Sequence, residues 1–267
     1  MELSKRLTAV AGFVEQGAVL ADIGTDHGYV PIALVRRGVI PRAIAMDVNA
    51  GPLARAQAHI REYGLEDRIE TRLGDGLSQL RPGEADTLLI AGMGGPLICR
   101  ILGEGMETAR AARRLVLSPQ SEMKEVRRFL CRHGFQIRDE AMVKEDGKYY
   151  VILLACPAAA DTGIHTDEMM ETAGPSPDAG VRETGQTEAG CSETDWTEAD
   201  WAYGRKLLER RDPVLREFLQ KEREKYQSIT GRLSDRETGS PAQMSRRKEV
   251  EEALAVIAQA ERQWEIT

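Results

Sequence analysis

The residues best suited to chemistry lie in one stretch, which reads Ala21-Asp-Ile-Gly-Thr-Asp-His-Gly-Tyr29. An apolar run precedes this stretch and another follows it, so a strand should enter a tight turn and leave as a helix. Gly24 permits a sharp turn and lets a ligand approach the backbone closely. The free N–H groups at the start of the helix would suit a carboxylate. An ordinary turn without a ligand is the alternative.

Asp26 indicates which cofactor would suit this turn. A dinucleotide-binding turn needs a second glycine at this position, and a carboxylate here would repel a pyrophosphate. The same carboxylate would favour a ligand with positive sulfonium and amino groups. The turn therefore predicts S-adenosylmethionine rather than a nicotinamide dinucleotide, and we expect Asp22, Gly24, Asp26 and His27 to bind it.

Two further loops occur where such a cofactor would need them. Asp47 ends the second predicted strand, about 20 residues after the glycine turn, where an acid can bind both ribose hydroxyls. The tripeptide Gly74-Asp75-Gly76 follows the third strand, where the adenine edge could be read. Each could also be an ordinary turn, because Asp and Gly are common at strand ends. The order of the three loops favours a cofactor site.

A glycine-rich loop, Ile90-Ala-Gly-Met-Gly-Gly-Pro96, follows the fourth predicted strand. Catalytic groups of open α/β sheets lie at the carboxyl ends of strands, and glycines there would leave bare backbone beside a reactive methyl group. We therefore expect Ala91 and Gly92 to bind the cofactor, and Gly92, Met93 and Gly94 to belong to the catalytic centre. Tight packing of a turn is the alternative. The Asn/Asp-Pro-Pro-aromatic motif of many enzymes that methylate exocyclic amines does not occur here.

A parallel sheet would bring these loops to one edge. Strand-like apolar runs at residues 18–23, 43–46, 69–73, 87–91 and 115–117 alternate with helical patterns at 30–37, 53–63 and 122–133. A hairpin follows, with strands 135–143 and 149–156 around the turn Asp146-Gly147. The predicted fold class is α/β, and residues 1–156 resemble the Rossmann-like, seven-stranded sheet of class I methyltransferases.

The remainder of the chain divides into two further segments. Residues 157–200 are acidic, repetitive and poor in apolar side chains, so we expect a disordered linker or insertion. Residues 201–267 carry two apolar stripes at helical spacing, separated by a break from 231 to 241. They predict two helices that pair as an antiparallel hairpin or short coiled coil.

Charge is unevenly distributed along the chain, whose net charge is −7. Residues 1–156 hold 21 basic and 20 acidic side chains, residues 157–201 hold one and 11, and residues 202–267 hold 14 and 12. Because the acidity is confined to one segment, the overall balance does not exclude a nucleic-acid partner. The cysteines and histidines lack metal-ligand spacing, so no metal is predicted. Without a membrane-spanning run or signal peptide, we expect a cytoplasmic protein.

Four motifs together resemble one bacterial family, the tRNA adenine N1-methyltransferases called TrmK, which modify adenine 22. They are Leu3-Ser-Lys-Arg-Leu7, the stretch from Ala21 to Tyr29, Ile90-Ala-Gly-Met-Gly-Gly95 and Glu145-Asp-Gly-Lys148. The resemblance covers residues 1–156 and resumes near Tyr203-Gly204, where the family has a helical coiled-coil domain. Three features depart from the family pattern: Asp47 in place of a common Glu, Ser118-Pro119-Gln120 in place of Gln-Pro-Asn, and residues 158–200.

The resemblance implies methyl transfer from S-adenosylmethionine to N1 of adenine 22 in tRNA. Tyr29 would then stack on the flipped adenine, or else be an ordinary core or helix-start aromatic, and Asp26 would contact either the cofactor or the adenine amine. We expect a monomer. Two other functions stay open: a methyltransferase for a small molecule or protein, and a non-catalytic module that binds tRNA or cofactor.

Basic side chains near the predicted site and on the helices would hold tRNA phosphates, or else be solvated helix faces. They are Lys5, Arg6, Arg36, Arg37, Arg205, Lys206, Arg210 and Arg211.

Overall fold

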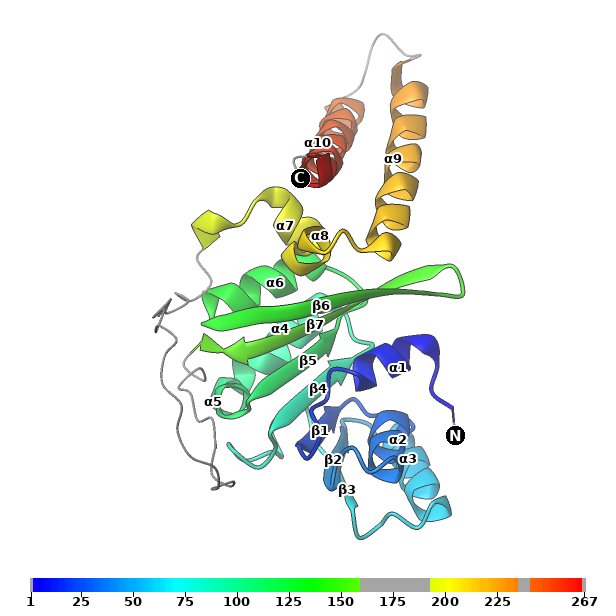
Figure 1. Ribbon diagram of the computed structural model, residues 1–267, viewed down its shortest axis with the longest axis vertical. Helices are drawn as coiled ribbons and strands as arrows, with labels where there is room; N and C mark the ends of the chain where they lie inside the picture. The colour runs from blue at the N-terminus through cyan, green and yellow to red at the C-terminus, as the bar shows by residue number, and fades with distance from the viewer. Residues whose placement is uncertain (1, 159–192, 235–240, 266–267) are drawn as a thin grey trace, which may run out of the picture.

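Five parallel strands carry the predicted loops to one edge of a sheet in the computed structural model, which describes residues 2–158, 193–234 and 241–265. They are β1 Val19–Ile23, β2 Arg42–Asp47, β3 Ile69–Leu73, β4 Thr87–Ala91 and β5 Arg114–Ser118. The full sheet has seven strands in the order β3-β2-β1-β4-β5-β7-β6 (Figure 1). The chain reverses its strand order between β1 and β4, which is where ligands bind in open α/β sheets.

The last two strands form the predicted hairpin. β6 Phe135–Glu145 and β7 Lys148–Pro157 are antiparallel, and β7 also pairs antiparallel with β5. Asp146 and Gly147 both have positive φ angles, of 48° and 76°, as a two-residue type I′ turn requires. The predicted fold class, a Rossmann-like methyltransferase sheet, is confirmed.

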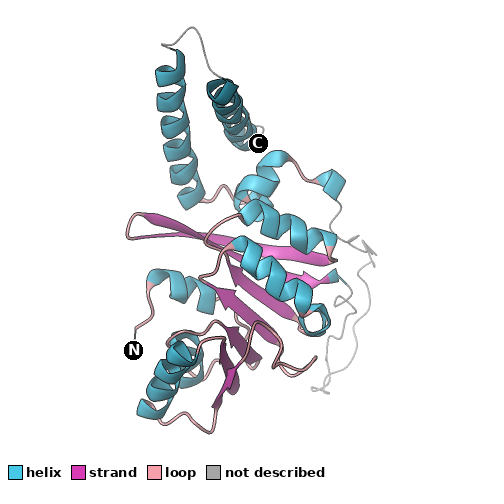
Figure 2. Ribbon diagram, turned by 180° about the vertical axis from the view of Figure 1, so that it is seen from behind, coloured by secondary structure: helices cyan, strands magenta, loops and turns pink. Residues whose placement is uncertain are grey.

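Helices cover both faces of the sheet, because strand side chains alternate between two cores. Leu20, Leu89 and Val116 pack with α1 Lys5–Ala11, α2 Tyr29–Arg36 and α3 Ala50–Glu62. Ile23, Ile90 and Leu117 face the other way, towards α4 Gly95–Glu104, α5 Met106–Ala111 and α6 Met123–Arg132, on the face seen in Figure 2. Within the described ranges, no helix has the length and apolar character to span a membrane.

The C-terminal region holds more helices than the sequence predicts. A 3₁₀ turn at Glu193–Asp195 leads into α7 Glu198–Tyr203 and α8 Arg205–Glu209, both too short to show a clear periodicity. The two predicted helices are α9 Pro213–Ser234 and α10 Pro241–Glu265, which run antiparallel (Figure 1). Their pairing as a coiled coil stays a prediction. α7 begins before the predicted boundary at residue 201, and most of the predicted linker, 159–192, lies outside the described residues.

A buried ion pair joins the helical region to the sheet. Arg127 Nε on α6 donates to Glu140 Oε1 on β6 at 2.8 Å, and neither side chain has any exposed area. Arg127 Nη1 also donates to the carbonyl oxygens of Trp201 and Ala202, at 3.0 and 3.1 Å. The second oxygen of Glu140 accepts from the backbone N–H of Lys206 at 3.0 Å. Groups from two regions of the chain thus bind both charges, and Arg127 Nη2 is left buried without a hydrogen-bond partner.

The backbone is shaped to admit this ion pair. A β-bulge between Ile137 and Asp139 shifts the register of β6, which turns Glu140 towards α6. Gly204, between α7 and α8, has a φ of +95°, and a Cβ there would lie 2.5 Å from Glu140 Oε1. Only glycine fits, because any side chain would both strain the backbone and displace the carboxylate.

We predict that Gly204→Ala destabilises the protein by about 2–4 kcal/mol, through backbone strain and the disturbed buried ion pair. Urea unfolding of the full chain measures this difference. Gly231→Ala on α9 is the control, since a Cβ there meets no atom within 4 Å and alanine favours a helix by roughly 0.5–1 kcal/mol. Equal stability of the two variants would show that Glu140 tolerates the added methyl group.

Candidate functional site

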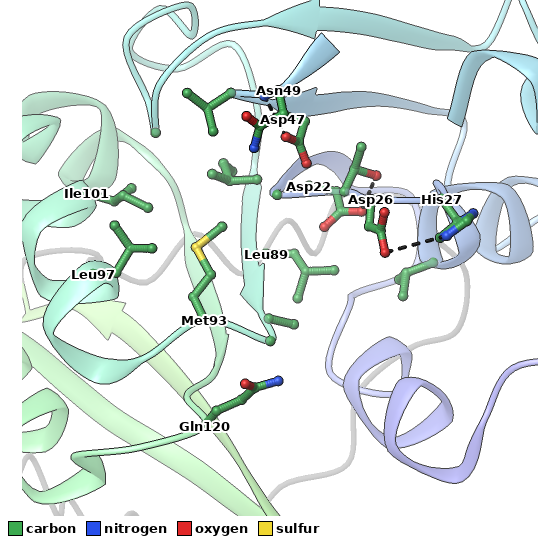
Figure 3. A pocket seen from close by; sticks show the side chains of 18 of the residues that line it. Asp22, Asp26, His27, Asp47, Asn49, Leu89, Met93, Leu97, Ile101 and Gln120 are labelled. Carbon is green, nitrogen blue, oxygen red and sulfur yellow. Dashed lines mark hydrogen bonds and ion pairs between the residues drawn. The ribbon is translucent and has the colours of Figure 1, made fainter. Parts of the chain in front are cut away.

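A cavity of about 550 Å³ lies at the carboxyl ends of β1, β2 and β4 (Figure 3). Every predicted site residue except Gly94 lines it: Asp22, Gly24, Asp26, His27, Tyr29, Asp47, Gly74, Asp75, Gly76, Ala91, Gly92 and Met93. The glycine turn is fixed there by β2, because the carbonyl oxygen of Met46 accepts from the N–H groups of Gly24 and Thr25, at 2.8 and 2.9 Å. The loops thus share one cavity, while the roles of their residues stay predictions.

Asp22 is a buried carboxylate at the base of the turn. Its Oδ2 accepts from the Thr25 hydroxyl at 2.6 Å, and its side chain is 6% exposed. Burial raises the pKa of Asp22 from 3.8 to about 7; the Thr25 hydrogen bond opposes this shift, and the nearby charge of Asp47 adds to it. A cation bound beside Asp22 would therefore relieve an unfavourable buried charge.

Asp47 ends β2 with one carboxylate oxygen engaged. Its Oδ1 accepts from the backbone N–H of Asn49 at 2.8 Å, which fixes the side chain where the strand gives way to α3. The residue is 8% exposed and lines the cavity. A carboxylate held in this way can accept hydrogen bonds from two neighbouring hydroxyls of a ribose.

Asp26 occupies a strained position at the mouth of the cavity. Its φ of 43° lies in the left-handed region, which costs a non-glycine residue about 1–2 kcal/mol. Its Oδ1 accepts from Arg55 Nη2 on α3 at 2.9 Å, and its Oδ2 lies 3.6 Å from His27 Nε2. The side chain is 60% exposed, so it can meet a ligand at the entrance.

Three aromatic rings stack beside this mouth. The ring of Tyr29 lies 5.0 Å from that of His27 and 5.5 Å from that of His59, with interplanar angles of 6° and 18°. His59 Nδ1 lies 3.0 Å from the carbonyl oxygen of His27, which ties α3 to the turn. Tyr29 is 37% exposed. It is therefore not a core aromatic; it is the first residue of α2, as in the helix-start alternative, and its stacking on a base stays a prediction.

Two of the predicted glycines face the cavity for different reasons. A Cβ on Gly24 would lie 2.2 Å from Met93 Cε, so this turn accommodates a side chain that crosses from β4. Gly92 has a φ of +84°, and a Cβ there would meet only Arg6 and Gln120 within 4 Å. Bare backbone therefore borders the cavity at Gly92. Figure 3 shows Met93 with Leu97 and Ile101, across the cavity from Asp22 and Asp26.

Gly94 is not brought to the cavity. It is the residue before α4, and a Cβ on it would lie 3.2 Å from Ser121 Oγ. Its neighbour Gly95 is packed still more tightly, since a Cβ there would lie 2.6 Å from the Ser121 carbonyl oxygen. Both glycines therefore let α4 approach the loop after β5, which is the packing alternative weighed for this loop.

Arg6, expected near the site as a phosphate contact, also lines the cavity. Several other lining residues were not predicted, because their spacing carries no signal. They come from α4 and from the loops after β1, β2 and β5, and include Thr25, Asn49, Leu97, Arg100, Ile101 and Gln120. Arg100 forms an ion pair with the predicted Asp75 at 3.2 Å. The Asp75 carboxylate is therefore already engaged.

Some of the predicted basic clusters serve the structure itself. Arg205 and Lys206 both pair with Glu209, at 3.2 and 3.0 Å, and Arg210 pairs with Asp139 on β6. These contacts stabilise α8 and its packing on the sheet. In the ranges that the structure covers, no group of three or more His, Cys, Asp or Glu residues is placed to hold a metal ion.

Comparisons with protein families, with curated proteins and with solved structures all match this chain to methyltransferases. A family model described as a methyltransferase domain matches residues 3–153. A Bacillus subtilis protein named tRNA (adenine(22)-N(1))-methyltransferase is 41% identical over 155 residues, which are 58% of this chain and 65% of that relative. The alignment thus spans slightly less than two thirds of the relative's length.

Two solved structures match nearly the whole chain. The crystal structure of the Bacillus subtilis M1A22 tRNA methyltransferase TrmK is 30% identical, with a TM-score of 0.75 and coverage of 97% of this chain and 98% of that one. A Streptococcus pneumoniae protein in complex with S-adenosyl-L-methionine is 32% identical, with a TM-score of 0.75 and coverage of 97% and 99%. The chain belongs to the methyltransferase-domain family and, within it, to the bacterial tRNA (adenine-22-N1)-methyltransferases called TrmK.

Proposed function

We propose that this chain transfers a methyl group from S-adenosylmethionine to N1 of adenine 22 in tRNA. The observation that carries the proposal is a pair of buried carboxylates in the cavity: Asp22 on β1, just before the glycine turn, and Asp47 at the end of the neighbouring strand β2. This acidic cavity suits a ligand with a sulfonium and an ammonium group and disfavours a pyrophosphate. The relative's activity and the cofactor held by the related structure support the same conclusion.

The residues of the cavity fit the parts of S-adenosylmethionine. Asp47 would accept from the ribose hydroxyls, and Asp22 and Asp26 would face the positive groups. The N–H groups at the start of α2 would meet the carboxylate. Met93, Leu97 and Ile101 supply an apolar wall. When bound, the cofactor supplies an electrophilic methyl group on a positively charged sulfur.

The acceptor atom needs little chemical help from the protein. N1 of adenine is nucleophilic as a neutral base, so no proton is removed before it attacks, and the methylated base leaves as a cation. Because N1 lies on the pairing edge, the base must be unpaired or swung out first. Tyr29, which is 37% exposed, can stack on it, which contributes about 1–3 kcal/mol. Positioning can supply about 7–11 kcal/mol of the barrier.

The proposed substrate indicates where the protein acts. A tRNA-modifying enzyme works where tRNA is, so we place this chain in the cytoplasm. We also propose that it acts as a monomer. The helices from α7 to α10 form a second domain that we expect to contact the body of the tRNA. Their tight attachment to β6 would hold that contact at a constant distance from the cavity.

Methyl transfer to tRNA tests the proposal directly. With labelled S-adenosylmethionine and an unmodified tRNA transcript that has adenine at position 22, the product should contain 1-methyladenosine. Replacing that adenine by guanine in the transcript should abolish the labelling. Transfer to protein or small metabolites, with none to tRNA, would favour the alternative substrates. Cofactor binding without any transfer would favour a non-catalytic module.

Asp47→Ala should weaken S-adenosylmethionine binding at least tenfold. The loss of hydrogen bonds from a charged acceptor costs about 1.5–3 kcal/mol. Titration calorimetry on the full chain measures this affinity. Asp67→Ala is the matched control, because it removes an exposed carboxylate just before β3 and should leave affinity unchanged. If Asp47→Ala bound as tightly as the control, Asp47 would have no part in the site.

Asp22 should make the ligand-free protein less stable as the pH rises. The pKa of Asp22 is about 7 in the folded protein and 3.8 for an ordinary aspartate. Its contribution to the free energy of unfolding is therefore fully present below about pH 3.8 and is lost as the pH rises through about 7. Urea unfolding at about pH 5, 7 and 8 should show this loss, and Asp22→Asn should remove most of it. Affinity for the cationic cofactor should rise over the same range in the wild type. Parallel stability profiles for both proteins would contradict the assignment.

A further inference from the structure

Arg6, on α1, lines the cavity, but the mechanism proposed above assigns it no specific contact. Its Nη1 atom is buried without a hydrogen-bond partner. A buried donor without an acceptor costs about 1–3 kcal/mol. The face of the Tyr150 ring, 5.2 Å from the guanidinium carbon, offsets only part of that cost. A ligand that supplies an acceptor would remove the remainder.

The β6–β7 hairpin holds Arg6 in place. The carboxylate of Glu145 at the end of β6 accepts from the backbone N–H of Arg6 at 3.3 Å, and Tyr150 on β7 lies against its guanidinium group. Two family motifs that are far apart in the sequence, Leu3–Leu7 and Glu145–Lys148, thus meet beside the cavity. These contacts fix the position of the Arg6 guanidinium. Ordering a long side chain costs conformational entropy, which a side chain that is only solvated would not need to lose.

The position of Arg6 along the sheet edge assigns it to the acceptor side. Asp47 and Asp22 follow β2 and β1, whereas Gly92 follows β4 and Gln120 follows β5. A Cβ built on Gly92 would lie 3.5 Å from Arg6 Nη1 and 3.7 Å from Gln120 Nε2. Arg6 and Gln120 therefore flank Gly92 beyond the carboxylates that suit the cofactor. The methyl acceptor must enter on this side.

The charge of Arg6 identifies the part of the acceptor that it contacts. The other arginine in the cavity wall, Arg100, is paired with Asp75 and Glu104, at 3.2 and 2.9 Å. A cation against the base would oppose the positive charge that develops as N1 is methylated. The phosphate of the same nucleotide is anionic and offers the two oxygens that a guanidinium binds best.

We infer that Arg6 binds the phosphate of the nucleotide whose adenine enters the cavity. The inference rests on the proposed function and adds the residue that holds the flipped nucleotide. The hairpin that orients Arg6 is itself braced by the helical domain. Tyr149 and Lys144 both contact Glu217 on α9, at 2.8 and 2.5 Å.

Arg6→Met in the full chain tests the inference through three measurements. The kcat/KM for the tRNA transcript should fall at least tenfold, mainly through KM. The slope of log affinity for tRNA against log salt should decrease by about one, as the loss of one phosphate contact requires. The affinity for S-adenosylmethionine by calorimetry should stay within about twofold of wild type, which also shows that the cavity is folded. Arg6→Lys should retain the salt slope and part of the activity.

Arg113→Met is the matched control. It removes one cation at the opposite end of the sheet, where the guanidinium is 76% exposed and 4.0 Å from Asp86. An unchanged salt slope and kcat/KM in Arg6→Met would overturn the inference. So would a loss of cofactor affinity equal to the loss of kcat/KM, because Arg6 would then hold the cofactor carboxylate. A wild type that transfers no methyl group to tRNA would overturn the proposed function itself, and the inference with it.

Discussion

The buried ion pair between Arg127 and Glu140 is the interaction on which the attachment of α7 and α8 to the sheet depends. Two charges without exposed area are tolerated only where hydrogen bonds satisfy them, and removing one partner of such a pair typically costs about 3–5 kcal/mol. Here the remaining partners are backbone groups of α7 and α8. Both charges belong to the α/β region and pair with each other, and the helices supply further hydrogen bonds to both of them. Loss of α7 and α8 would expose the pair and remove these bonds, but it would leave neither charge unpaired.

The β6–β7 hairpin extends this dependence to the cavity. Successive side chains of a strand point to opposite faces, and Tyr149 and Tyr150 use both. Tyr149 packs edge-on against Phe218 of α9, with ring centroids 5.1 Å apart, while Tyr150 faces Arg6 on the other side. One short hairpin thus separates the helical domain from the acceptor side of the cavity. A tRNA bound to α9 would therefore contact a helix that packs directly on the β6–β7 hairpin, which positions Arg6.

Much of the fold and the cavity could be predicted because local rules govern them. The alternation of apolar runs with helical patterns predicts the parallel sheet, and Asp146-Gly147 predicts the hairpin turn. Carboxyl ends of parallel strands meet at one edge, so the loop residues could be grouped without coordinates. Long-range contacts could not be predicted. Arg6 was expected near the site, but nothing in its spacing places it beside Gly92. The helices α7 and α8 bury Trp201, Tyr203, Leu207 and Leu208, but each is too short to show a helical periodicity. Gly94 does not line the cavity but packs against Ser121, and the sequence alone cannot distinguish a glycine needed for packing from one needed for a ligand.

The distribution of charge in the cavity explains how one site can serve a cationic cofactor and a polyanionic substrate. Carboxylates gather at β1 and β2, and the unpaired guanidinium donor lies at the β4–β5 side. In the proposed reaction, the sulfonium charge of the cofactor lies on the side of the cavity that holds Asp22 and Asp26. Arg6, on the other side, binds the phosphate of the acceptor nucleotide in the inference above. The raised pKa of Asp22 is consistent with this distribution of charge. Burial makes the ionised carboxylate unfavourable, so a bound cation would stabilise it strongly. The acidic side of the cavity thus suits the charged cofactor, and the basic side suits the phosphate of the substrate.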